Sequence, residues 1–142
     1  MADLSDYSEN ETLEWMFKDY SPSSHGNVYV SLHTADEGDS PDGSNEVDSG
    51  TTNYSRVQTE PGEWDISSSN DATEVENNTE VVFGDPDSEW GEVTHFTIWT
   101  EDEGVTGEEP LTATIELDES KTIDSEDDEV RFNSGALNFQ LD

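Results

Sequence analysis

The segment of residues 88–100, SEWGEVTHFTIWT, has the highest density of apolar residues in the chain, and these residues alternate. A period of two among β-branched and aromatic residues is typical of a β-strand. Two sets of side chains are expected to point to opposite sides: Thr94, Phe96 and Ile98 on one, and Val93, His95, Thr97 and Trp99 on the other. Because both sides carry large groups, we expect a central strand, covered on both faces or on one face and by a subunit contact.

Shorter alternating segments predict a mainly β protein. The expected strands are 27–34, 53–58, 64–66, 74–83, 111–117, 121–123, 129–132 and 136–141. About seven to nine short strands at regular spacing are typical of an antiparallel β-sandwich or jelly roll. Residues 35–53 form a long loop rich in Asp, Gly and Ser, and no linker or repeat divides the chain. We therefore expect a single domain over residues 1–142, with the sandwich in 27–142.

One N-terminal helix is expected over residues 3–20. Asp3 or Ser5 can cap its first turn, and an approximate apolar stripe runs along it. Trp15 lies off that stripe and is therefore expected to face a partner. The pattern leaves open whether the helix packs on the sheet or docks on a neighbouring molecule.

The acidity of the chain bounds the conditions in which it can fold. Its 142 residues include 37 Asp plus Glu against 4 Lys plus Arg, a formal net charge of -33. Such a charge is compatible with disorder or with a folded protein in concentrated salt, where the Debye length falls to about 3 Å. Four Trp, four Tyr and five Phe recur within alternating segments, and disordered chains are usually poor in aromatics. We therefore expect a folded halophilic protein with a modest core that is helped by partner subunits.

Composition also excludes several classes. The chain has no cysteine and so no disulfide or thiolate chemistry. No segment approaches the ~18 apolar residues of a membrane span, and the N-terminus lacks the basic and apolar regions of a signal peptide. Four cations cannot form the basic face that phosphate contact requires. We expect no membrane or nucleic-acid partner, synthesis in the cytoplasm, and release by a route such as lysis if the protein works outside a cell.

Catalytic and metal-binding motifs are missing from the sequence. It has no Gly-x-Ser-x-Gly, phosphate loop or Gly-rich dinucleotide turn, so we expect no enzyme. The segment DEGDSPDG at 36–43 places Asp36, Asp39 and Asp42 among glycines, and hard cations such as calcium prefer such oxygen clusters. Its spacing does not match an EF-hand. We therefore expect a solvated acidic loop, with no cofactor beyond structural cations or high salt.

The few basic side chains have simple expected roles. His25, His33 and His95 lack the ligand spacing of a zinc site, and His95 is expected to be packed or to lie at an interface. Arg56 and Arg131 lie near aromatic residues of expected strands and are expected to form local salt bridges.

Several segments occur in a characteristic order: LSDYSEN at 4–10, VYVSLHTAD at 28–36, EV at 46–47, YSR at 54–56, WGEVTHFTI at 90–98 and VRFNSGAL at 130–137. Nearly the whole chain thereby resembles a family of small virion structural proteins of tailed phages, whose members are described as tail fibre, minor tail or head-associated proteins. The WGEVTHF block and the closing GAL are the most specific parts. Family loops are rich in Gly, Thr and Ala, whereas these are rich in Asp and Glu, which matches a virus of an extreme halophile such as an archaeon.

The resemblance implies a non-enzymatic component of a virus particle, made in the host cytoplasm and located in the virion. A compact 142-residue domain suits capping a local symmetry axis, so a minor capsid or decoration protein is the first hypothesis and a tail or tail-fibre protein the alternative. The expected partners are other virion proteins and further copies of the chain, with a trimer favoured. Aromatic residues concentrate binding energy at interfaces, and the expected interface residues are Leu13, Trp15, Phe17, Trp90 and His95.

Two hypotheses from other classes compete with the structural one. An acidic DNA mimic would occupy a DNA-binding protein of the host, and the net charge suits it, but the even spread of acid over all loops does not. A carbohydrate-binding sandwich would use exposed Trp side chains. Detection in purified virions separates the structural hypothesis from the mimic, and glycan-array binding would support the third.

The charge predicts a fold that depends on salt. We expect β structure to form in molar salt and to be lost in dilute buffer, because below ~0.1 M salt the Debye length exceeds ~10 Å and self-repulsion is no longer screened. Far-ultraviolet circular dichroism across a salt titration measures this directly. An unchanged β signal below ~0.1 M salt would contradict the prediction.

Overall fold

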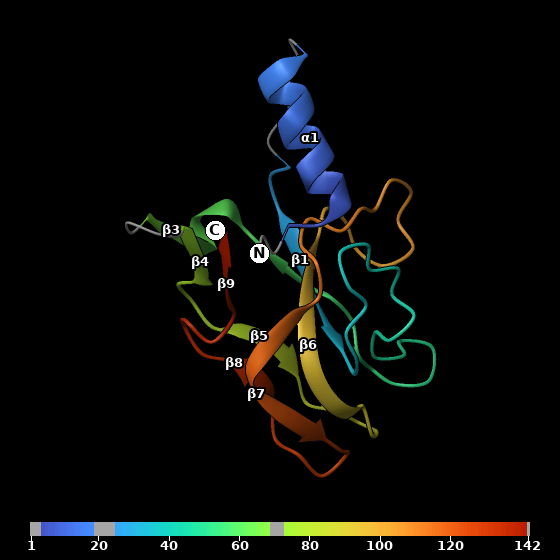
Figure 1. The fold of residues 1–142 in the computed structure, drawn as a ribbon. Helices are drawn as coiled ribbons and strands as arrows, with labels where there is room; N and C mark the ends of the chain where they lie inside the picture. The colour runs from blue at the N-terminus through green and yellow to red at the C-terminus, as the bar shows by residue number, and fades with distance from the viewer. Residues whose placement is uncertain (1–3, 19–24, 69–72, 142) are drawn as a thin grey trace.

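The structure is a computed structural model that describes residues 4–18, 25–68 and 73–141 (Figure 1). In chain order its elements are α1 (Asp6–Phe17), β1 (Val28–His33), β2 (Val57–Thr59), a 3-10 turn (Pro61–Glu63), β3 (Trp64–Ser68), β4 (Thr73–Asn77), β5 (Val81–Gly84), β6 (Gly91–Trp99), β7 (Ile115–Ile123), β8 (Val130–Phe132) and β9 (Asn138–Leu141). No helix within these ranges is both long enough and apolar enough to cross a membrane.

The strands form three antiparallel sheets. A four-stranded sheet has the order β2-β1-β6-β7, a three-stranded sheet has the order β3-β4-β9, and β5 pairs with β8. In Figure 1 the β3-β4-β9 sheet lies to one side of β1 and β6, and one buried cluster draws side chains from all three sheets. The arrangement is sandwich-like, and the prediction of a mainly β antiparallel fold with one helix near the N-terminus is confirmed.

Strand β6 is the centre of the largest sheet, as the sequence predicts. It pairs with β1 in the register Val30↔Ile98 and Leu32↔Phe96. On its other edge the pairing with β7 jumps from Val93↔Lys121 to His95↔Glu116. This irregularity corrects the predicted alternation, because Val93 joins Phe96 and Ile98 in the same core cluster and does not face away from them.

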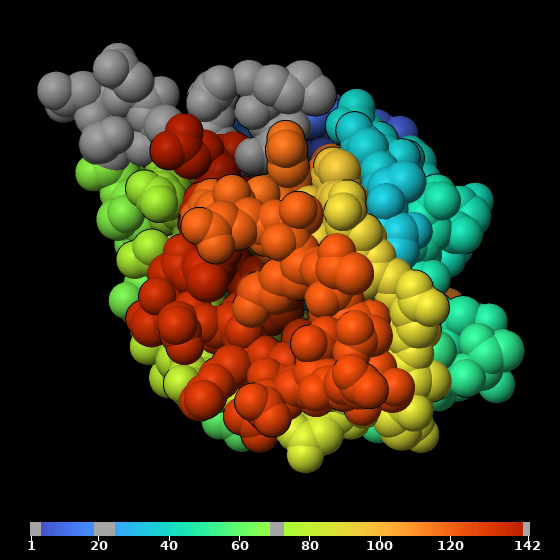
Figure 2. All heavy atoms as spheres, turned by 90° about the horizontal axis from the view of Figure 1, so that it is seen from below, coloured from blue at the N-terminus to red at the C-terminus, as the bar shows by residue number. Residues whose placement is uncertain are grey.

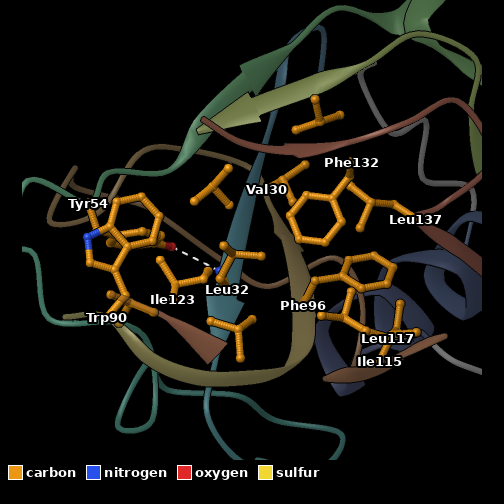
Figure 3. Packing of buried hydrophobic residues seen from close by; sticks show 14 of the residues in the cluster. Val30, Leu32, Tyr54, Trp90, Phe96, Ile115, Leu117, Ile123, Phe132 and Leu137 are labelled. Atoms are coloured by element: carbon orange, nitrogen blue, oxygen red, sulfur yellow. Dashed lines mark hydrogen bonds between the residues drawn. The ribbon is translucent and has the colours of Figure 1, made fainter. Parts of the chain in front are cut away.

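The core fills the space between the sheets. Figure 3 shows the rings of Phe96 and Phe132 in the same cluster as Val30, Leu32 and Leu137, and all five are buried. At full burial each such side chain contributes roughly 1.5–3 kcal/mol relative to exposure. A core of this size, in a chain whose hydrophobic fraction is only 29%, leaves the fold dependent on good packing.

Trp90 belongs to this core, which corrects its expected place at an interface. The side chain is 4% exposed and stands edge-on to Tyr54, with ring centroids 5.5 Å apart (Figure 3). Its indole Nε1 donates to Asn53 Oδ1 at 3.2 Å. Gly91 has φ 90°, a conformation that favours glycine, and it turns the chain from Trp90 into β6. The sequence pattern alone cannot show this turn, which folds the ring inward.

Most strand boundaries differ from the prediction, as for the strand expected over 53–58, which is β2 at Val57–Thr59, and in two places the chain is divided into strands differently. The segment 74–83 is not one strand, because Asn77 ends β4 and binds the next turn through its amide. Asn77 Nδ2 donates to the carbonyl oxygens of Thr79 at 2.7 Å and Asn133 at 3.0 Å. Conversely, the expected strands 111–117 and 121–123 are largely one strand, β7, which begins only at Ile115.

Helix α1 is shorter than predicted, and Ser5 is its N-cap. The Ser5 hydroxyl accepts from the amide of Ser8 at 3.2 Å and donates to the carbonyl of Pro110. The Ser5 amide also donates to the carbonyl of Leu111 at 3.2 Å. Asp3 and Tyr20 lie outside the described residues. No residue of α1 is buried, so the expected apolar stripe does not pack on the sheet, and the helix projects from the upper end of the molecule (Figure 1).

The opposite end of the molecule is formed mainly by the C-terminal third of the chain, coloured orange to red in Figure 2. This end exposes many polar side chains of β7 and of the turn that follows it. The exposed apolar side chains of α1 lie at the other end of the molecule.

Candidate functional site

A buried ion cluster around Arg56 is the first of two features that could carry function. The Arg56 guanidinium donates to both carboxylate oxygens of Glu46, at 3.0 Å and 2.8 Å, and to Glu108 Oε2 at 2.6 Å. It also lies 4.0 Å from the centroid of the Trp99 ring. Burial acts to lower the pKa of Arg56, but its hydrogen bonds to the Glu46 and Glu108 carboxylates and their negative charge outweigh burial and raise that pKa. The expected local salt bridges of Arg56, and of Arg131 with Glu80 at 3.3 Å, are confirmed.

A hydrogen-bonded chain runs beside this cluster. Trp99 Nε1 donates to Ser31 Oγ at 2.7 Å, Ser31 Oγ lies 2.6 Å from His33 Nε2, and His33 Nδ1 contacts the Glu37 carboxylate. Burial lowers the pKa of the His33 imidazole, against the opposing attraction of Glu37. If His33 is neutral with its proton on Nδ1, every polar atom in this chain of hydrogen bonds has a partner. Nδ1 then donates to the Glu37 carboxylate, and the Ser31 hydroxyl donates to Nε2.

The order serine, histidine, carboxylate is that of a nucleophile, a general base and the group that orients it. Here, however, Ser31 and His33 are completely buried, and the Ser31 hydroxyl is already engaged by Trp99 and His33. Neither residue lines the large groove described below. The chain of contacts therefore ties β1 to β6 and to the following loop, and no substrate can approach the hydroxyl in this conformation.

Glu37 also organises the acidic loop that the sequence singled out. Its carboxylate accepts from the amides of Gly43 at 2.7 Å and Asn45 at 3.2 Å. The Asp36 carboxylate accepts from the Thr114 hydroxyl and the Gly38 amide, and these hydrogen bonds lower the pKa of Asp36.

Asp42 is likewise used within the loop. Its Oδ1 accepts from the Ser44 amide at 2.9 Å, and hydrogen bonds to Ser44 lower the pKa of Asp42. Across the described ranges, no three His, Cys, Asp or Glu side chains come close enough to share a metal ion. The structure therefore does not bring Asp36, Asp39 and Asp42 together as a cation site.

The second feature is a groove beside α1 with a volume of about 600 Å³. The helix contributes one wall, and β3, β4 and β9 contribute the apolar side chains of Trp64, Ile66, Val75 and Phe139. His25 also lines the groove, 6.4 Å from the Tyr7 ring between centroids. Most of the lining is apolar, and the arrangement suits contact with another apolar surface more than polar chemistry.

The predicted interface residues fall in different places. Leu13, Trp15 and Phe17 are exposed on α1, and their role at an interface stays a prediction. His95 is half-buried in β6, where its Nδ1 lies 2.7 Å from Thr94 Oγ1, and its interface role also stays a prediction. Trp90 is buried within this chain and is not available to a partner.

Sequence reasoning missed the contacts of Ser31, His33 and Glu37. A signal was present, because Ser31 and His33 alternate on one face of a strand and Glu37 follows four residues later. The spacing of residues in the sequence does not reveal that Glu37 closes the loop, because its carboxylate binds backbone amides within residues 42–45.

The fold is therefore that of a sandwich-like β protein with a buried polar centre and a helix that exposes apolar side chains. Residues 3–140 match the family model described as podophage GP4 fiber I protein gp80. The chain belongs to this family of phage fibre proteins and is a virion structural protein. No individually curated protein matches the chain significantly.

The family confirms the resemblance to virion structural proteins of tailed phages and supports association with other virion proteins. It favours the tail-fibre alternative over the capsid location that the sequence placed first. A structural fibre family also agrees with the expectation of a non-enzymatic protein.

The Arg56 cluster predicts a sharp difference between the two arginines. Arg56→Lys should lower the free energy of unfolding by about 2–4 kcal/mol, because lysine cannot bind Glu46 with two parallel bonds and also reach Glu108, which leaves buried charge poorly paired. Arg131→Lys is the matched control and should change stability by less than about 0.5 kcal/mol, since its ion pair is exposed. Chemical denaturation in molar salt measures both. Equal effects of the two substitutions would contradict the assigned role.

The lowered pKa of His33 predicts a specific pH dependence. The unfolded chain binds the proton near pH 6.5, whereas folded His33 binds it only at lower pH. Stability contributed by neutral His33 is therefore complete above about pH 6.5 and is lost as the pH falls through the window below it. An NMR titration should find His33 still neutral at about pH 6.5. His33→Gln should lack this part of the pH dependence, and protonation of His33 at or above pH 6.5 would show the prediction to be wrong.

Proposed function

We propose that this protein is a component of the tail fibre of a virus particle. The observation that carries the proposal is the family match, which spans residues 3–140 and so includes both α1 and the sandwich. The buried polar centre supports a passive, shape-holding role, because its hydroxyl and imidazole are engaged inside the protein. On this proposal the sandwich is a rigid body, and its contacts with neighbours are made by the surface at α1.

The exposed side chains of α1 support a role in assembly. Leu13 is 55% exposed, Trp15 56%, Met16 60% and Phe17 76%. Exposed apolar surface of this kind marks interaction sites on soluble proteins. We propose that other fibre proteins and further copies of this chain are the partners, with a trimer as the homo-oligomer.

The charge supports a further element of the proposal, namely assembly in concentrated salt. A net charge of -33 on 142 residues favours expanded and separated chains in dilute solution. Screening over about 3 Å in molar salt removes most of that repulsion. A particle that infects an extreme halophile, such as a haloarchaeon, would supply this environment.

Localisation in the particle tests the proposed function. Purified virions that encode this chain should contain it by mass spectrometry, and immunogold electron microscopy should place the label at the tail. An antibody against the major capsid protein is the control and should label the head. Label confined to the head would return the protein to the capsid hypothesis. Absence from the particle would overturn both locations and favour the DNA mimic, for which a host DNA-binding partner would then be sought.

A further inference from the structure

Helix α1 lines an apolar groove on one face and exposes apolar side chains at its end. Residues of α1 and the residue Leu4 before it line one side of the groove. They are spaced three and four apart in the sequence: Leu4, Tyr7, Ser8, Glu11, Thr12 and Trp15. That spacing places the side chains on a single face of a helix. The opposite wall comes from β3, β4 and β9.

A different face of α1 carries an apolar knob, which we define as Leu13, Met16 and Phe17. These residues are also three and four apart and therefore adjacent on the helix surface, and each is more than half exposed. They do not line the groove of their own chain. One helix thus presents a hollow on one face and a knob on another.

The base of α1 is fixed, which makes the knob a rigid feature. In addition to the contacts of Ser5, the amide of Asp6 donates to the carbonyl of Asp39 at 3.0 Å, and the Ser40 hydroxyl binds the Asp6 carboxylate. Leu4 forms a bridge with Thr112. The helix is therefore held at its first turn and presents its last two turns at a defined angle to the groove.

We propose that the knob of one copy occupies the groove of a second copy of this chain. This inference rests on the homo-oligomer proposed above and specifies its contact surface. The knob and the groove lie on different surfaces of one chain, so the contact is heterologous, and such contacts produce closed rings when the rotation between copies closes. A trimer is one such ring.

The exposed apolar area supplies part of this contact. An aromatic side chain buries 150–250 Å² when fully covered, and Trp15 and Phe17 are both more than half exposed. With Leu13, Met16 and the exposed Ile66 on the groove wall, the uncovered apolar surface is on the order of 600 Å², divided between the knob of one copy and the groove of the other. A stable interface buries roughly 800 Å² per partner, so polar surface around the knob and the groove has to supply the larger part of the buried area.

The local charges favour a copy of this chain as the occupant. Lys18, one of two lysines in the chain, follows the knob and is largely exposed, with only a weak contact to Glu14 at 3.6 Å. Among the described residues that line the groove, Glu11 is the one carboxylate. A knob that enters the groove brings Lys18 toward Glu11 of the second copy. The contact thus has local complementarity within a like-charged pair, and we expect it to strengthen as salt screens the remaining charge.

Cysteine cross-linking tests the contact cleanly because the natural chain has no cysteine. Two single variants, Phe17→Cys on the knob and Ile66→Cys on the groove wall, are mixed in molar salt with a mass tag on one copy. Docking holds the two thiols at millimolar effective concentration, so the mixed disulfide should form at least about tenfold faster than between unassociated copies. The control pair is Phe17→Cys with Val82→Cys, a residue of β5 that is 37% exposed.

A second measurement does not depend on disulfide chemistry. Light scattering in molar salt should find oligomers for the natural chain and for Val82→Ser, and monomers for Phe17→Ser, with the circular dichroism of all three unchanged. A mixed disulfide no faster than the control, or a folded natural chain that stays monomeric at every salt concentration, would overturn the inference. Either result leaves the presence of the protein in virions unaffected, whereas absence from virions would overturn the proposed function and leave self-association standing.

Discussion

The fold depends on how Arg56 balances the charge of the buried Glu46 carboxylate. The side chains of Glu46 and Arg56 are at most 4% exposed, and a single buried carboxylate without a partner would be strongly unfavourable. The guanidinium has hydrogen-bond partners along its edges and an aromatic ring near its face. It forms two parallel bonds to Glu46, contacts Glu108 and lies over the Trp99 ring. In a chain with only four Lys plus Arg, placing one of them here ties the loops at residues 46 and 108 to the centre of the largest sheet.

Strand β6 connects this polar cluster to the apolar core because its two faces have different environments. Phe96 and Ile98 face the core cluster, whereas Trp99 meets Arg56 and donates to Ser31 on β1. From Ser31 the contacts continue to His33 and then to Glu37, which closes the acidic loop. The side chains on the two faces of β6 therefore have different kinds of partner, apolar on one face and polar on the other. A substitution on one face is expected to shift the strand and with it the contacts of the other face.

The sequence predicted the elements of this fold better than their boundaries and contacts. The alternation in 88–100 identified β6, and the aromatic content correctly favoured a folded β protein over disorder. The strand expected over 74–83 was wrong because the amide of Asn77 binds backbone carbonyls from the turn and from residue 133, a long-range contact that local pattern does not contain. Trp90 was expected at the surface for a similar reason, since its burial depends on the turn at Gly91 and on Tyr54. The exposure of Trp15 was anticipated because it lies off the helical stripe, whereas Leu13 and Phe17 belong to that stripe and were selected as interface residues of the helix.

Helix α1 is the element whose apolar side chains are least covered by contacts within one copy of the chain. A helix of 12 residues is marginal in water without tertiary packing, and no residue of α1 is buried. Its capped first turn fixes where it starts, but Leu13, Met16 and Phe17 near its end are each more than half exposed. A partner that covers them would supply the missing burial, and a second copy does so without adding a new kind of surface. Because like charges oppose that contact, the acidity that is predicted to make the fold sensitive to salt would also make assembly sensitive to salt, so folding and assembly would respond to one variable.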